Sequence, residues 1–348
     1  MLPADHIRII INNNTDKLEY SNKYHKGELG NLSFLITGGA GFIGSHIVEY
    51  LLNFGAAKVR VLDNLVTGSY ENIEAFTSNP AFEFVEGDIR DIETCKSAMS
   101  EIDFVSHQAA IGSVPRSIID PVFTNSVNVD GFVNVITAAK EAVVKRFVFA
   151  SSSSVYGDEE SLPKVEENIG NQLSPYAVSK YANELYADVF SRTYGMECIG
   201  LRYFNVFGPR QDPAGQYAAV IPRFIEQLLS GQDVYIDGDG KQTRDFTFVE
   251  NAVQMNIRSM FTDNDDAINT VYNVACGEKL SINELFKNIC KLTASSKAAI
   301  YKDVRPGDIK HSLADISKAE NFLDYASIIF FKEGIEKTID SFAKQYMG

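Results

Sequence analysis

The sequence predicts an α/β fold, a doubly wound parallel sheet with helices on both faces and a smaller C-terminal lobe. The first observation behind this prediction is that short β-rich runs alternate with helical patterns along the first half of the chain. Strands separated by helices are joined by right-handed crossovers, which make the strands parallel. The second observation is that the alternation loosens after residue 205, where shorter mixed pieces follow.

The expected strands are "SFLITG" (33–38), "KVRVLDN" (58–64), "FEFVEGD" (82–88), "DFVSHQAA" (103–110), "RFVFASS" (146–152) and "ECIGLRYF" (197–204). Between them, apolar residues recur at intervals of three and four in "GSHIVEYLLNFG" and "NVDGFVNVITAAKEAV", which indicates helices. After residue 205, "VYIDGDG", "SINELFKNICKLT" and "SKAENFLDY" indicate a mixed lobe over the carboxyl edge of the sheet. Folds of this kind bind their ligands at that edge.

Composition and charge argue against several classes of function. Acidic residues outnumber basic ones by 46 to 32, the net charge is −14, and no run of Lys or Arg could neutralise a nucleic acid. No apolar run approaches the roughly 20 residues that span a bilayer, and residues 1–30 lack the features of a signal peptide. We expect those residues to form a poorly ordered or capping arm. The four cysteines show no CxxC and no metal-like spacing, which predicts reduced thiols, a cytoplasmic protein and no metal site.

A glycine-rich turn follows the first strand directly. "TGGAGFIGSH" carries Gly38, Gly41 and Gly44 at intervals of three, with a helix after them. Free N–H groups and the positive end of the helix dipole suit a pyrophosphate at such a turn. Asp63 closes the second strand, where its carboxylate would accept the ribose hydroxyls of an adenosine. The turn and Asp63 together predict a Rossmann-type dinucleotide-binding sheet.

The same carboxylate selects between the two nicotinamide dinucleotides. Asp63 would repel a 2′-phosphate, and the "NLVTG" that follows supplies no arginine to hold one, so NAD is favoured over NADP. Asp88 in "EGDIRD" closes the third strand. It would either reach the adenine or cap a helix, and the sequence leaves both interpretations open.

"SPYAVSK" places Tyr176 four residues before Lys180, just after a proline that can begin a helix. Oxidation of a secondary alcohol needs a base beside the nicotinamide. A free tyrosine has a pKa of about 10, and lowering it to about 7 takes about 4 kcal/mol of preferential stabilisation of the phenolate. Lys180, one helical turn on, and the cationic nicotinamide are the charges that we expect to supply it.

The motifs occur in the order found in the extended short-chain dehydrogenase/reductase family. From about residue 33 to 318 the chain resembles that family through the glycine turn, Asp63, "GDIRD", "HQAA", "SSSSVYG", "SPYAVSK" and "LRYFNVFGP". Within the family it is most similar to nucleotide-sugar 4-epimerases, and among them to bacterial UDP-N-acetylglucosamine 4-epimerases of polysaccharide biosynthesis. The resemblance implies an NAD-binding domain over 31–205 after the N-terminal extension (1–30), and a mainly nucleotide-sugar-binding lobe over 206–348, with an interleaved boundary. It also implies a homodimer formed through helices at about 123–142 and 176–194.

The resemblance assigns catalysis to Tyr176 as base, Lys180 as electrostatic and ribose anchor, and Ser152 as the partner of the substrate oxygen. The run of Ser151 to Ser154 leaves the identity of that serine open by one position. Phe204 is expected to lie against the nicotinamide. The cofactor-binding residues so implied are Gly38, Gly41, Phe42, Ile43, Gly44, Asp63, Asn64, Thr67, Gly68, Asp88, Ile89, Gln108, Ala109, Ala110, Tyr176, Lys180 and Phe204.

The second half is expected to hold a UDP-sugar. Arg244 in "TRDF" and Arg305 with Asp308 in "RPGD" resemble residues that hold the diphosphate and the uridine ribose. Ser312 replaces a bulky tyrosine of hexose-only epimerases, which leaves room for a 2-acetamido group. The substrate-binding residues so implied are Gly112, Ser113, Ser152, Ser153, Tyr176, Asn205, Ala219, Val220, Tyr235, Arg244, Arg305, Asp308 and Ser312.

Other activities of the same superfamily are weighed against this one. The 4,6-dehydratases carry an Asp-Glu pair where this chain has Ser153 and Ser154, which disfavours dehydration. A UDP-glucuronate decarboxylase or 4-epimerase stays an alternative, and activity on UDP-glucose and UDP-galactose stays open. A non-catalytic NAD-binding sensor is less favoured, because Tyr176 and Lys180 are both present.

Overall fold

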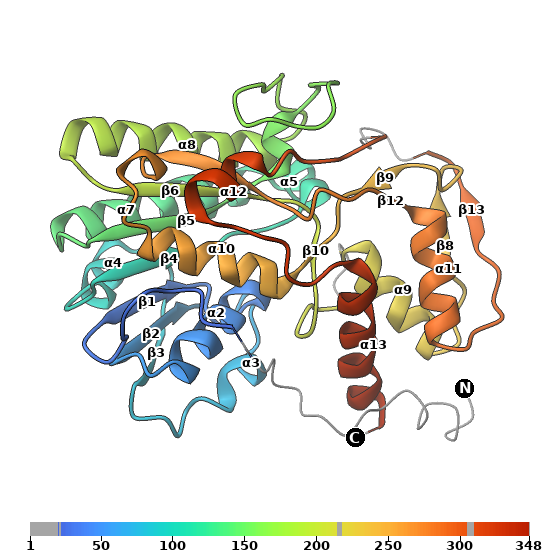
Figure 1. The fold of residues 1–348 in the computed structure, drawn as a ribbon, viewed down its shortest axis with the longest axis horizontal. Coiled ribbons are helices and arrows are strands. Elements are labelled where there is room, and N and C mark those ends of the chain that lie inside the picture. The colour runs from blue at the N-terminus through green and yellow to red at the C-terminus, as the bar shows by residue number, and fades with distance from the viewer. Residues whose placement is uncertain (1–19, 21, 214–217, 305–309, 348) are drawn as a thin grey trace.

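The computed structural model describes residues 20, 22–213, 218–304 and 310–347 (Figure 1). Most of the predicted N-terminal extension therefore lies outside the described residues, as do Arg305 and Asp308. No helix of the described part of the chain is long and apolar enough to cross a membrane.

A parallel sheet of seven strands forms the centre of the molecule. Its strands are β1 (Ser33–Thr37), β2 (Lys58–Asp63), β3 (Phe82–Glu86), β4 (Phe104–His107), β5 (Arg146–Ser152), β6 (Cys198–Tyr203) and β11 (Thr270–Val274). They lie in the order β11-β6-β5-β4-β1-β2-β3, and every neighbouring pair is parallel. The chain runs outward from β1 to β3 and then returns to the other side of β1 at β4, which opens a crevice at the carboxyl ends of these strands. The predicted doubly wound α/β sheet is confirmed.

Helices cover both faces of this sheet, as the alternation of side chains along β1 requires. Phe34 and Ile36 pack on one face, whereas Leu35 packs on the other. The first face carries α2 (Phe42–Asn53), α10 (Val249–Phe261) and α12 (Ser317–Leu323). The second carries α4 (Ile92–Ala98), α7 (Gly131–Glu141) and α8 (Pro175–Tyr194). Shorter helices α3 (Glu71–Glu74), α5 (Val114–Ile119) and α6 (Pro121–Asn125) lie in the connections, and a π-helix (Ser126–Asp130) joins α6 to α7.

The sequence analysis missed the seventh strand. β11 pairs with β6 although the whole span from residue 206 to 248 and helix α10 intervene. The strand–helix–strand alternation in fact continues through α10 into β11, and the insertion before α10 hides it. "TVYNV" carries the β-branched and aromatic residues of a strand, so a signal was present.

The smaller lobe lies beside the carboxyl edge of the sheet, where Figure 1 shows α9, α11 and α13 grouped together. It consists of α9 (Val220–Leu229), α11 (Ile282–Leu292) and α13 (Phe331–Met347) with three two-stranded ladders. The ladders pair β7 (Val206–Phe207) with β10 (Thr247–Phe248), β8 (Tyr235–Asp237) with β13 (Ile300–Lys302), and β9 (Thr243–Arg244) with β12 (Leu280–Ser281). Phe224, Leu285 and Phe342 are central to its separate apolar core.

The described part of the N-terminal extension packs against α2 and α10. Tyr24 stacks on Tyr50 of α2 with ring centroids 5.3 Å apart. The hydroxyl of Tyr24 donates to Glu250 Oε1 of α10 at 2.7 Å, and the Tyr20 hydroxyl donates to the carbonyl of His46 at 3.0 Å. Residues 20 and 22–26 thus cover the seam between these two helices.

Candidate active site

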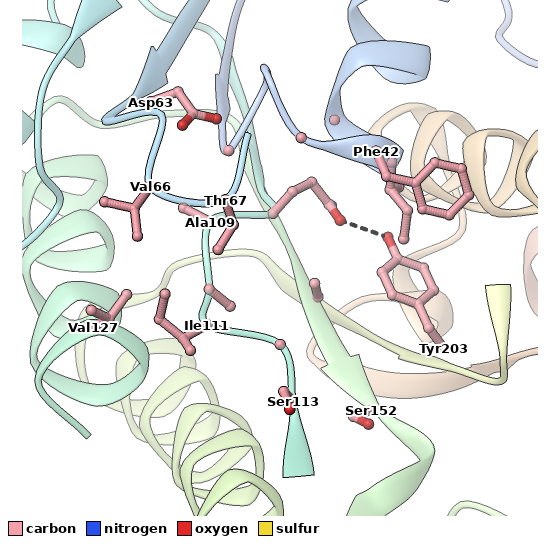
Figure 2. A pocket seen from close by; sticks show the side chains of 18 of the residues that line it. Phe42, Asp63, Val66, Thr67, Ala109, Ile111, Ser113, Val127, Ser152 and Tyr203 are labelled. Atoms are coloured by element: carbon pink, nitrogen blue, oxygen red, sulfur yellow. Dashed lines mark hydrogen bonds between the residues drawn. The ribbon is translucent and has the colours of Figure 1, made fainter. Parts of the chain in front are cut away.

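Two adjoining cavities lie where the sheet meets the lobe. The first has a volume of about 630 Å³ and opens at the carboxyl ends of β1, β2, β4 and β5 (Figure 2). The second, of about 690 Å³, lies toward the lobe. Both cavities are lined in part by the same four residues, Ser113, Asn205, Ala218 and Ala219, so they share a boundary. Both are defined by the described residues alone.

The glycine turn forms one wall of the first cavity. Gly38 has a φ of +69°, and a Cβ there would lie 2.6 Å from the backbone nitrogen of Ala109. A Cβ on Gly44 would collide with the carbonyl oxygen of Gly38. Gly41 precedes α2, and no side chain of the described residues caps this helix end, so its first N–H groups are available to an anion.

Asp63 stands at the end of β2 on the same wall, as Figure 2 shows. Its side chain is buried, and its two carboxylate oxygens accept hydrogen bonds from the N–H of Ala40 (3.0 Å) and Leu65 (2.9 Å). Burial raises the pKa of Asp63, while these backbone hydrogen bonds oppose the rise. Each oxygen keeps a second lone pair for a further donor such as a ribose hydroxyl.

Three predicted cofactor residues line neither cavity. Asp88 pairs with Arg90, with 2.6 Å between Oδ2 and Nη2, and it also accepts from Asn64 Nδ2 at 3.1 Å. The helix that follows is capped by Asp91 instead, so the capping interpretation of Asp88 was wrong. Gly68 packs against Ala40 and Asp63 outside the cavity wall.

Phe204 is the third. Its ring is fully buried against Tyr156, with centroids 5.9 Å apart. The preceding residue Tyr203 lines the first cavity instead, and its hydroxyl donates to Gln108 Oε1 at 3.1 Å (Figure 2). Successive side chains of an extended chain point in opposite directions, so Tyr203 faces the cavity whereas Phe204 packs on the other side, and the place of Phe204 at the nicotinamide stays a prediction.

Ser152, Tyr176 and Lys180 all line the first cavity, Ser152 at the end of β5 and the other two in the first turns of α8. Ser174 caps α8 and Pro175 occupies its first turn, which places Tyr176 and Lys180 on successive turns of one face. The Lys180 ammonium is buried and donates to the carbonyl of Ala150 at 2.8 Å. Burial lowers the pKa of Lys180 to about 8.

The phenol of Tyr176 is not yet activated by these residues alone. Burial raises its pKa above the ordinary value, and the hydrogen bond with Ser152 opposes the rise. The Lys180 ammonium donates to the Ala150 carbonyl, and it is not among the groups that shift the pKa of Tyr176 in this structure. The expected lowering of the pKa of Tyr176 therefore depends on the positive charge of the bound cofactor.

The structure separates the four consecutive serines. The Ser151 hydroxyl is buried and donates to Glu184. Ser152 lines the cavity, opposes the rise of the Tyr176 pKa, and its hydroxyl accepts from the Ser154 hydroxyl at 2.9 Å. Ser153 lines neither cavity. Ser152 is thus the serine whose hydroxyl lies beside the phenol.

The second cavity contains part of the predicted substrate site. Arg244 and Val220 line it, and Asn205 lines both cavities. Ser312 is buried and donates its N–H to the carbonyl of Thr243 at 3.0 Å, but it lines neither cavity. Tyr235 also lines neither, since Lys302 lies over its ring, with Nζ 3.8 Å from the centroid.

The remaining predicted residues occupy the first cavity. They are Phe42, Ile43, Asn64, Thr67, Ile89, Gln108, Ala109, Ala110, Gly112 and Ser113. Sequence reasoning missed several others, namely Val66, Ile111, Phe123, Val127 and Tyr203 in the first cavity and Arg223 and Gln242 in the second. Val66 lay within the "NLVTG" segment already singled out, whereas Val127 sits on a helical segment whose apolar residues resemble ordinary core.

The sequence matches the NAD dependent epimerase/dehydratase family over residues 34–275. A putative UDP-glucose 4-epimerase of Methanocaldococcus jannaschii is 41% identical over 308 residues, which span 88% of this chain and 97% of that protein. The chain belongs to the NAD-dependent epimerase/dehydratase family. The predicted membership of the extended short-chain dehydrogenases is thereby confirmed, and so is the kind of enzyme.

Solved structures of family members superpose on the whole described fold. A UDP-glucose 4-epimerase of Thermotoga maritima with UDP-glucose is 36% identical, with a TM-score of 0.85 over 90% of this chain and 100% of its own. A UDP-N-acetylglucosamine 4-epimerase of Methanobrevibacter ruminantium, in complex with UDP-N-acetylmuramic acid, is 39% identical, with a TM-score of 0.83 over 91% of this chain and 98% of its own.

NAD is the cofactor of this family, as predicted, and the first cavity fits it. The glycine turn admits no Cβ, the start of α2 is uncapped, and the Asp63 carboxylate keeps free lone pairs at the far end from Tyr176. These three features suit a pyrophosphate and an adenosine ribose that still carries its 2′-hydroxyl.

Proposed function

We propose that this NAD-dependent nucleotide-sugar 4-epimerase interconverts UDP-N-acetylglucosamine and UDP-N-acetylgalactosamine through a 4-keto sugar. One observation carries the proposal. Ser152, Tyr176 and Lys180 line the cavity that begins at the glycine turn, and that cavity adjoins a second one lined by Arg244. A sugar placed at the shared boundary would have its carbon 4 near the phenol and its nucleotide in the lobe.

Each of the three residues has a proposed role. Tyr176 takes the proton of the 4-hydroxyl and later returns it, and the Ser152 hydroxyl, which lines the same cavity, holds the sugar oxygen. Lys180 uses one ammonium N–H for the carbonyl of Ala150, which leaves two for the nicotinamide ribose. Bound NAD supplies the two-electron oxidation and reduction at carbon 4.

The second cavity is proposed to bind the nucleotide while the 4-keto sugar rotates in the first. Arg244 lies on β9 and Val220 begins α9, and both face this cavity, which suits a diphosphate and a base. Asn205, at the shared boundary, donates from Nδ2 to the carbonyl of Asp245 at 3.0 Å, which fixes its amide beside the expected phosphate. Arg305 and Asp308 stay predictions from the sequence.

The N-acetylated substrate is proposed on two grounds. Ser312, bonded to the strand that carries Arg244, is short and buried, so no bulky side chain from this position narrows the sugar site. The Methanobrevibacter ruminantium neighbour is itself named a UDP-N-acetylglucosamine 4-epimerase. UDP-glucose is the second candidate, because the Methanocaldococcus jannaschii and Thermotoga maritima relatives are named for it.

A homodimer is also proposed. α8 exposes Val178, Leu185 and Val189, which are 54%, 50% and 44% exposed. The neighbouring α5 and α6 expose Ile118, Ile119 and Val122 to a still greater degree. Exposed apolar side chains gathered on neighbouring helices are typical of a protein interface. The partner surface is therefore expected on α8, α5 and α6, and the part of the helix at about 123–142 in it stays a prediction. The cytoplasmic location stays a prediction.

The test is to incubate the purified protein with UDP-N-acetylglucosamine without added NAD and to follow the configuration at carbon 4 by proton NMR. UDP-glucose and UDP-glucuronate are run in parallel. Formation of the galacto product from the acetylated sugar, at the highest kcat/KM of the three, supports the proposal. Preferred turnover of UDP-glucose favours the second candidate, and carbon dioxide released from UDP-glucuronate identifies a decarboxylase.

A further inference from the structure

Three successive turns of α8 contact three successive residues of β5. Tyr176, Lys180 and Glu184 recur every four residues and therefore share one face of the helix. Lys180 donates to the carbonyl of Ala150, and Ser152 lies close enough to the phenol of Tyr176 to oppose the rise of its pKa. Between these two contacts, the hydroxyl of Ser151 donates to Glu184 Oε1. Glu184, the third residue on this face of α8, thus holds Ser151, which lies between Ala150 and Ser152 on β5.

Glu184 is itself held rigidly. Arg202 on β6 donates to both of its oxygens, from Nε at 2.9 Å and from Nη2 at 2.8 Å. Such a two-pronged contact restricts the rotation of a carboxylate. Arg202 pairs in register with Ser151 across the sheet, and its Nη1 donates to the carbonyl of Glu166 at 2.8 Å. The side chains of Glu184 and Arg202 are only 7% and 3% exposed.

Glu184 does not line the cavity, so it contacts no reacting atom. Its contact with Ser151 nevertheless lies one residue before Ser152, at the point where β5 ends and a 3₁₀ turn (Ser153–Tyr156) begins. A shift of Ser151 at this point would carry the Ser152 hydroxyl away from the phenol of Tyr176. A displacement of about 1 Å in such a constellation can lower turnover by about 100-fold.

We propose that Glu184, oriented by Arg202, is a positioning residue that acts through Ser151 to hold Ser152 against Tyr176. This inference rests on the proposed function, because it assumes that Ser152 and Tyr176 react with the sugar. A buried ion pair is by itself weak evidence of a role in stability. Because the Glu184–Arg202 pair contacts Ser151, the residue before Ser152, we expect loss of this contact to lower turnover more than it lowers stability.

The decisive variant is Ser151→Ala. It removes the hydroxyl that links β5 to α8 and leaves the Glu184–Arg202 ion pair intact. Glu184→Gln, in contrast, would leave the buried guanidinium of Arg202 without a charged partner and could prevent folding. Ser33→Ala is the matched control. Ser33 also donates from a strand to a carboxylate, Asp103 Oδ2 at 2.8 Å, but at the amino end of β1, the opposite edge of the sheet.

Both variants and the wild-type protein are compared by kcat, KM, bound NAD and midpoint of thermal unfolding. Ser151→Ala is expected to lower kcat about tenfold, with KM and bound NAD within twofold of wild type. Ser33→Ala is expected to keep kcat within twofold of wild type, even if its midpoint of thermal unfolding falls as far as that of Ser151→Ala. A kcat of Ser151→Ala within twofold of wild type overturns the positioning role alone. Inactivity of the wild-type protein on all three UDP-sugars overturns the proposed function, and this inference with it.

Discussion

The two cavities of this protein are built in different ways. The first is walled by the ends of four long parallel strands and by the start of α2, so backbone atoms set much of its shape. The second is walled by residues such as Ile236, Arg244 and Ile282, which come from two-residue or three-residue strands and a helix start in the lobe. Substitutions in the first cavity should therefore act almost as all-or-none changes, whereas those in the second should be graded.

The largest expected effect is that of Tyr176→Phe in the first cavity. The change removes the proposed base and keeps the ring, so kcat is expected to fall about 10³-fold or more while NAD stays bound. Turnover is measured by NMR and bound NAD after denaturation of the purified protein. Tyr181→Phe on the same helix, which lines neither cavity, is the control and should keep kcat within twofold. Activity above a tenth of wild type in Tyr176→Phe would remove this residue from the mechanism.

Next in size is the loss of NAD in Gly44→Ala. The new Cβ would collide with the Gly38 carbonyl, so the turn cannot keep the conformation that presents N–H groups to the pyrophosphate. The purified variant is expected to carry at least tenfold less NAD, with turnover reduced in proportion. Gly30→Ala, whose Cβ would have 3.9 Å of clearance, serves as control. A Gly44→Ala protein with wild-type NAD content contradicts the account of a backbone-built cavity.

The same contrast explains which features the sequence could predict. The glycine turn, Asp63 and the Tyr176–Lys180 pair follow from local spacing on strands and helices, and the structure brings them into one cavity. Ser312 and Tyr235 were inferred from resemblance alone, and neither lines a cavity, because long-range packing in the lobe decides where such side chains lie. Phe204 and Asp88 line neither cavity, since Phe204 packs against Tyr156 and Asp88 pairs with Arg90, and their roles at the cofactor stay predictions.

β11 was missed for a related reason. Its pairing with β6 joins residues far apart in the chain, and no local pattern records that contact. The choice of Ser152 among four serines likewise needed the partners of each hydroxyl, in particular Glu184 for Ser151. Local periodicity thus predicts elements, whereas long-range contacts decide register and orientation.

A graded effect is expected for Arg244→Ala in the second cavity. Loss of hydrogen bonds to a charged phosphate costs about 2 kcal/mol, which corresponds to about a 30-fold higher KM for the UDP-sugar. Arg244→Lys should recover part of this, since it keeps the charge but not the planar fork. Bound NAD should not change in either variant. Lys241→Ala, in the same segment and largely exposed, is the control. A loss of NAD in Arg244→Ala would show that the cavities are not independent.

The smallest effect on catalysis is expected outside both cavities, in Tyr24→Phe. The variant loses the hydroxyl that donates to the buried Glu250, which should lower the free energy of unfolding by about 1–2 kcal/mol at neutral pH. Burial raises the pKa of Glu250, and the Tyr24 hydrogen bond opposes that rise. The carboxyl therefore favours the folded state fully below its unfolded pKa, and this contribution is lost as the pH rises through the raised folded pKa.

Without the Tyr24 hydroxyl the pKa of Glu250 should rise further, so the destabilisation by Tyr24→Phe should be larger at pH 7 than at pH 4, which denaturant titration at both pH values measures. Tyr70→Phe, a half-exposed phenol, should change the free energy of unfolding by less than about 0.5 kcal/mol at either pH. Because Tyr24 lines neither cavity, kcat and KM of Tyr24→Phe are expected within twofold of wild type. A kinetic change as large as that of Arg244→Ala would mean instead that the seam between α2 and α10 transmits strain to the glycine turn.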